Sequence, residues 1–94
     1  MNELRFNSVW DALENSPAGA ANMKARADLM IAICETVEDW KITQAQAAKR
    51  LGVTQPRLND LVRGRIAKFS LDALMNLAFQ AGLSVHIDIV RPAA

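Results

Sequence analysis

The chain has 94 residues, 51% of them hydrophobic, and a formal net charge of +1 at pH 7. This length suits one domain that buries roughly 60–65% of its unfolded surface, and we expect no separate ligand-binding domain. No apolar run approaches the ~20 residues of a membrane span and the opening residues do not resemble a signal peptide, so we expect a cytoplasmic protein.

The sequence gives little indication of a catalytic or metal-binding site. The single cysteine, Cys34, excludes an internal disulfide, and its place on the apolar side of a predicted helix favours a buried core thiol. The single histidine, His86, lies far along the chain from Cys34. With no metal-ligand cluster, nucleophile–base spacing or phosphate-binding glycine loop, we expect no enzymatic activity, cofactor or metal.

The charges are unevenly distributed along the chain. Acidic residues outnumber basic ones before Trp40, whereas residues 49–68 hold one acid, Asp60, and six bases: Lys49, Arg50, Arg57, Arg63, Arg65 and Lys68. A basic segment of this kind is typical of a surface that binds phosphates.

The first elements are an arm and a long helix. Residues 1–21, followed by Asn22 in the run SPAGAAN, predict a loosely held arm, with a short helix over about residues 8–14 from the spacing of Phe6, Val9, Trp10 and Leu13. Trp10 either covers the core or packs on another protein. A longer helix is expected from a cap at Asn22 to Asp39 or Trp40. Its core face is predicted to hold Met23, Ala27, Met30, Ile31, Cys34 and Val37, widened by Leu29, Ile33 and Trp40.

Residues 43–61, TQAQAAKRLGVTQPRLNDL, have the pattern of two short helices joined by a tight turn. Thr43 and Gln46 have capping-box spacing for a helix over about 43–51, and Gly52 suits its left-handed end. Thr54 can cap a second helix over about 54–63. The predicted apolar contacts between the helices come from Ala47, Ala48, Leu51, Leu58 and Leu61. This is the pattern of a helix-turn-helix, whose second helix enters DNA.

A further helix follows, and then the hydrophobic period changes. Ser70 can cap the run FSLDALMNLAFQAG, which ends at Gly82 and has an apolar stripe of Leu71, Leu74, Leu77 and Ala78. In LSVHIDIV, hydrophobic and polar residues alternate as in a half-buried strand. A lone strand cannot satisfy its backbone, so we expect an antiparallel ribbon with the same strand of a second copy. The alternative is pairing near Leu4 to Phe6. The predicted dimer interface is Val85, His86, Ile87, Asp88 and Ile89.

The motif from Gln44 through Ala48 and Gly52-Val53 to Leu58 and Leu61 resembles the lambda-repressor-like group of helix-turn-helix proteins, the xenobiotic-response-element (XRE) family. From Phe6 to about Ile89 the chain also resembles a subgroup that looks like antitoxins of the host-inhibition-of-growth type. The expected fold is a mainly all-α, lambda-repressor-like bundle of about five helices, to which the alternating pattern of the tail adds one C-terminal β-strand for dimer pairing. The corresponding segments are an arm over 1–21, a DNA-binding domain over 22–83, and a strand and tail over 84–94.

Groove chemistry assigns roles to the second motif helix, and the resemblance implies the same division. Amide side chains suit adenine, Arg57 suits guanine or phosphate, and Asp60 either accepts from cytosine or orients Arg57 or Arg63. The predicted base contacts are Gln55, Pro56, Arg57, Asn59 and Asp60. The predicted phosphate contacts are Thr43, Gln44, Thr54, Arg63, Arg65 and Lys68. This helix differs from the Gln-rich or Ser-rich helices of phage repressors, so no operator sequence carries over.

These features predict a homodimeric repressor that binds double-stranded DNA at a near-palindromic operator. The resemblance further implies an antitoxin that controls its own operon and holds a small basic toxin inactive. Two alternatives stay open: a stand-alone XRE-family transcription factor without a toxin partner, and a protein-interaction module that has lost DNA binding.

Overall fold

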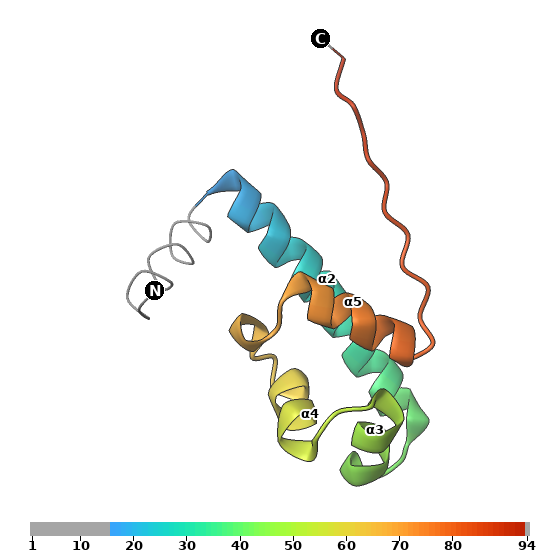
Figure 1. Ribbon diagram of the computed structural model, residues 1–94. Coiled ribbons are helices and arrows are strands. Elements are labelled where there is room, and N and C mark those ends of the chain that lie inside the picture. Colours follow the sequence, from blue (N-terminus) through green and yellow to red (C-terminus); the bar gives the residue numbers. More distant parts are fainter. Residues whose placement is uncertain (1–15, 94) are drawn as a thin grey trace.

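The computed structural model describes residues 16–93, which form a small helical bundle followed by an extended tail (Figure 1). The elements are the helices α2 (Pro17–Trp40), α3 (Gln44–Leu51) and α4 (Gln55–Val62), the 3-10 turn η1 (Ile66–Lys68) and the helix α5 (Leu71–Gln80). α5 lies alongside α2, and the pair α3–α4 packs at one side of them. None of the helices within residues 16–93 has both the length and the apolar character that crossing a bilayer requires.

Helix α2 begins earlier than its predicted cap. Ser16 is the N-cap, and its Oγ accepts from the backbone N–H of Gly19 at 2.9 Å, with Pro17 in the first turn. The sequence prediction of a cap at Asn22 is therefore wrong, and residues 17–21, predicted as arm, are helical. Proline needs no N–H partner in a first helical turn, which is why the Ser-Pro pair starts this helix. The predicted helix over residues 8–14 lies outside the described residues.

The motif helices begin and end as predicted. Thr43 and Gln46 form the capping box: the Thr43 hydroxyl accepts from the Gln46 N–H at 3.1 Å, and the Gln46 side chain accepts from the Thr43 N–H at 3.0 Å. Gly52 ends α3 with φ at 73°, a conformation that a Cβ atom disfavours. The Thr54 hydroxyl accepts from the N–H of Arg57 at 3.2 Å and so caps α4. Ser70 caps α5 in the same manner.

One hydrophobic core joins all four described helices. Its members are Met30, Ile33, Ala47, Ala48, Leu51, Leu58, Leu61, Phe69, Leu74, Leu77 and Ala78. Ala47 and Ala48 are small at the α3–α4 contact, which lets the helices approach closely. Ile31, predicted on the core face of α2, is 57% exposed, so that part of the prediction is wrong.

Cys34 links α2 to α4 as an uncharged thiol. The residue is half-buried, and its Sγ–H donates to the backbone oxygen of Leu61 at 3.5 Å. Burial raises the pKa of the Cys34 thiol above its ordinary value of 9.0, because the thiolate loses hydration. This environment suits a core residue better than a nucleophile.

The tail after α5 is extended, and the described residues contain no β-ladder. The last backbone hydrogen bond before it closes α5, from the N–H of Leu83 to the oxygen of Ala78 at 2.9 Å. From Ser84 to Ala93 no backbone group bonds to another described backbone group. The strand predicted over 84–90 is therefore not formed within this part of one chain, and its pairing with a second copy stays a prediction. The alternative partner near Leu4 to Phe6 lies outside the described residues.

Candidate nucleic-acid interface

Helix α4 separates a buried face from an outward one, as a recognition helix must. Leu58 and Leu61 are each 1% exposed and pack into the core. Pro56, Asn59 and Arg63 recur at the spacing of one helix face, and this face points away from the core. Of the residues predicted to contact bases, Gln55 and Pro56 are exposed and Asn59 is partly exposed.

Arg57 is held by the segment that follows α4. Its guanidinium lies 3.9 Å from the centroid of the Phe69 ring, and Nη1 donates to the backbone oxygen of Lys68 at 2.7 Å. A cation on an aromatic face is stabilised by about 0.5–2 kcal/mol, depending on its desolvation. Arg57 can therefore contact a base only after it breaks its contact with the Phe69 ring and its hydrogen bond to the Lys68 oxygen.

Asp60 forms ion pairs, but not with Arg57 or Arg63, the two residues that the sequence suggested as its partners. Its Oδ1 accepts from Nη1 of Arg65 at 2.9 Å and lies 3.6 Å from Nζ of Lys68. The prediction that Asp60 orients Arg57 or Arg63 is wrong, because Arg57 turns toward Phe69 and Arg63 donates from Nε to Asn59 at 3.3 Å. The chain turns back after α4, and this brings Arg65 and Lys68 to Asp60.

The residues predicted to contact phosphates surround α4. Gln44 opens α3, and Thr43 and Thr54 are the N-caps of the two motif helices. The free N–H groups at such helix starts suit phosphate oxygens. Arg63, Arg65 and Lys68 are exposed in the segment after α4. Three of the six bases of residues 49–68, Arg63, Arg65 and Lys68, thus form a basic loop after α4, next to its outward face.

A second cation–aromatic pair holds α3 on α2. The guanidinium of Arg50 lies 4.1 Å from the centroid of the Trp40 ring, across the turn between the two helices. The sequence analysis assigned no partner to Arg50. The sequence contains little indication of this contact, because a basic residue in the last turn of a helix is already explained by its favourable interaction with the helix dipole.

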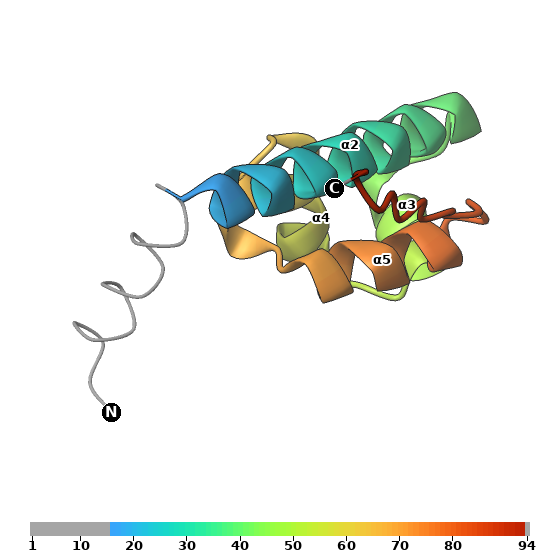
Figure 2. The same cartoon turned by 90° about the horizontal axis from the view of Figure 1, so that it is seen from above.

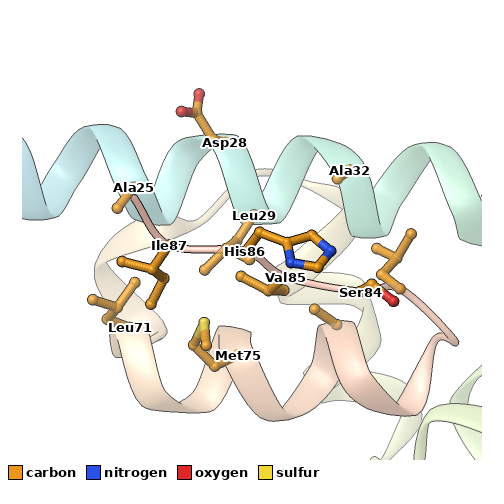
Figure 3. Close-up of a pocket in the computed structure, with 12 residues that line it drawn as sticks. Ala25, Asp28, Leu29, Ala32, Leu71, Met75, Ser84, Val85, His86 and Ile87 are labelled. Carbon is orange, nitrogen blue, oxygen red and sulfur yellow. The ribbon is translucent and has the colours of Figure 1, made fainter. Parts of the chain in front are cut away.

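The first three predicted dimer residues lie over an apolar groove between α2 and α5 (Figure 3), in the part of the tail that runs back from the end of α5 in Figure 2. Val85, His86 and Ile87 line this groove, whose volume is about 490 Å³, together with Leu29 of α2 and Met75 of α5. Further along the tail, Asp88 is exposed and Ile89 is 91% exposed. The tail therefore covers the groove only in part, and most of its own apolar surface meets water.

Comparison with known families gives one match, to a family described as "Helix-turn-helix domain", over residues 12–90. The matched range includes α2 to α5 and most of the tail. A comparison with curated proteins gives no match. A helix-turn-helix domain is a DNA-binding element, and the match indicates a DNA-binding regulator.

Proposed function

Because this chain belongs to the helix-turn-helix domain family, we propose that it is a sequence-specific repressor that binds a near-palindromic operator as a homodimer. The observation that carries the proposal is the arrangement of α4: Leu58 and Leu61 are buried while the opposite face is open beside a basic loop. We propose no enzymatic activity.

We expect the bases to be read mainly by Gln55, Pro56 and Asn59. Gln55 opens α4 and has both a donor and an acceptor, which suits the N6 and N7 edge of adenine. Asn59 has the same chemistry one turn further, with Arg63 as its present partner. Pro56 presents an apolar edge suited to a thymine methyl group. Arg57 and Asp60 reach bases only by giving up Phe69, Arg65 and Lys68.

Separating base reading from phosphate binding tests this proposal. On the selected operator, Gln55→Ala is expected to lose ~1–3 kcal/mol and to relax the preference at one base pair. Lys68→Ala should weaken binding to all duplexes alike, and reduce the slope of log K against log salt by about 0.9. The measurement is a titration of each variant on the operator and its single-base-pair variants at several salt concentrations. Identical sequence profiles for the two variants would contradict the assignment.

The homodimer is proposed because the tail exposes both apolar side chains and unpaired backbone. Ile87, Ile89 and Val90 are 71%, 91% and 82% exposed, and the neighbouring Phe79 of α5 is 79% exposed. A second tail, paired antiparallel across a two-fold axis, would satisfy the backbone groups that point toward it and cover part of this apolar surface. Two copies would also present two α4 helices to successive major grooves about 34 Å apart.

We further propose that the repressor is the antitoxin of a toxin–antitoxin pair. Besides the resemblance, a line of exposed residues on α2 supports this role. Asp28, Ile31, Glu35 and Glu38 share one face, so an apolar side chain is surrounded by carboxylates. Asp28 borders the apolar groove, and in Figure 3 its carboxylate points outward from α2, on the side away from α5. Such a face complements a small basic protein.

Expression together with the neighbouring gene distinguishes the antitoxin from a stand-alone transcription factor. We expect a small basic protein to co-purify with the tagged chain, and Ile31→Lys with Glu35→Lys to abolish co-purification while operator binding persists. Lys24→Ala removes the ion pair of Lys24 with Asp28 at 2.9 Å and so makes this face more acidic, and it should leave co-purification intact. Operator binding without any basic partner would favour the stand-alone factor, and failure to select any DNA would favour an interaction module.

A further inference from the structure

Arg26, in the middle of α2, is a buried charged side chain with no role in the proposed DNA contacts. It is 1% exposed. Its Nε donates to Oδ1 of Asn22 at 2.7 Å, and its Nη1 lies 3.3 Å from the oxygen of Ile66 and 3.4 Å from that of Phe69. A buried guanidinium loses several kcal/mol of hydration, so it persists only where acceptors surround it. These carbonyls lie forty or more residues along the chain, in the turn after α4.

The same turn is held from the opposite side by Arg57. Nη1 of Arg57 donates to the oxygen of Lys68, and its guanidinium covers the ring of Phe69, which is itself 1% exposed. The turn Ile66–Phe69 therefore offers three backbone oxygens to two arginines, one reaching it from α2 and one from α4. A 3-10 turn has poor internal hydrogen-bond geometry, so such outside contacts decide its position.

This turn sets the place of the basic loop. Lys68 lies within it and Arg65 directly precedes it, and both side chains reach the carboxylate of Asp60. If the turn shifts, the two cations shift with it, whereas α4, which begins at Gln55, keeps its N-cap at Thr54 and the core packing of Leu58 and Leu61.

We propose that Arg26 is a positioning residue for phosphate binding: from the core side it fixes the turn Ile66–Phe69, and with it the direction in which Arg65 and Lys68 meet the DNA backbone. Arg26 itself touches no DNA. This role rests on the proposed DNA-binding function, although the attachment of the turn to α2 does not.

Hydrogen exchange without DNA tests the attachment. The N–H groups of Lys68 and Phe69 donate within the turn, to Arg65 at 3.0 Å and to Ile66 at 3.1 Å. In Arg26→Met, which keeps a long apolar stem and removes the donors, these two amides should exchange at least tenfold faster than in the wild type. Ile33→Ala is the matched control, because Ile33 is fully buried on the same helix. It should speed exchange of core amides in proportion to lost stability, without singling out the turn.

Operator titration tests the consequence for DNA. At a temperature where every variant is folded, Arg26→Met should bind about tenfold more weakly with a salt slope lower by about 1–2, the share of two phosphate contacts, and with unchanged base preferences. Ile33→Ala should keep the wild-type slope. If Arg26→Met does not fold, Asn22→Ala removes one acceptor of the same guanidinium and should change both readouts in the same direction.

Three outcomes overturn the proposal in different ways. Wild-type exchange at Lys68 and Phe69 shows that Arg26 does not hold the turn. Faster exchange with an unchanged salt slope shows that the turn does not position phosphate contacts. Faster exchange in a protein that binds no duplex at all leaves the attachment intact, and it removes both the positioning role and the proposed function.

Discussion

Replacing both Ile87 and Ile89 by Asp is expected to convert the dimer into a monomer and to weaken operator binding by about 10²–10⁴-fold, the usual gain from linking two sites. In an antiparallel ribbon across a two-fold axis near the middle of the strand, residues 87 and 89 of the two copies lie on one face within directly opposite or diagonal reach, so the substitutions bring like charges close together. They also remove two exposed β-branched side chains, 71% and 91% exposed in the single chain, from the surface proposed to be covered. Sedimentation equilibrium gives the mass, and operator titration gives the affinity.

Arg91→Asp is the matched control for the double variant. It changes the net charge by the same amount, one residue beyond the predicted strand over 84–90, and it should leave the mass unchanged. General repulsion of DNA would affect the control and the double variant equally, whereas loss of pairing affects only the double variant. A double variant that remains dimeric would show that the two copies meet through another surface.

Leu61→Ala is expected to cost about 2–5 kcal/mol of unfolding free energy, because it leaves a cavity where α4 meets the core. Leu61 is 1% exposed, and its backbone oxygen accepts from Cys34. Small domains have about 5–15 kcal/mol of stability, so the melting temperature should fall by roughly 10 °C or more.

The neighbouring Val62 provides the comparison for this substitution. Val62 is 44% exposed, and Val62→Ala should stay within about 0.5 kcal/mol of the wild type, as surface substitutions usually do. Urea denaturation followed by circular dichroism measures both variants. Equal losses for the two would mean that α4 does not bury the face on which its outward orientation depends.

The helix-turn-helix could be predicted from the sequence because its signals are local. In the capping box, Thr43 and its partner Gln46 are only three residues apart. The end of α3 is indicated by Gly52 alone, because glycine readily adopts the left-handed conformation found there. The start of α2 was also encoded locally, in Ser16 and Pro17, but the surrounding Gly and Ala residues of SPAGAAN resembled a loop. Asn22, chosen instead as the cap, accepts from Arg26 one turn further along.

The interactions around the DNA-facing loop could not be predicted, because each depends on where distant segments meet. Arg26 reaches backbone oxygens at Ile66 and Phe69, and nothing in the spacing of α2 indicates acceptors there. Arg57 was assigned to bases from its place on α4, since the ring of Phe69, twelve residues later, gives no periodic signal. The composition identified the basic segment, and only the fold shows which of its charges are paired.

The contact between Arg50 and Trp40 gives the protein an intrinsic optical reporter. The indole ring lies under a guanidinium that belongs to the helix-turn-helix, so a displacement of α3 alters the surroundings of the fluorophore. The chain holds two tryptophans, and Trp10→Phe leaves Trp40 as the sole emitter. Emission from this ring can therefore follow the docking of α3 during folding and operator binding without any attached dye.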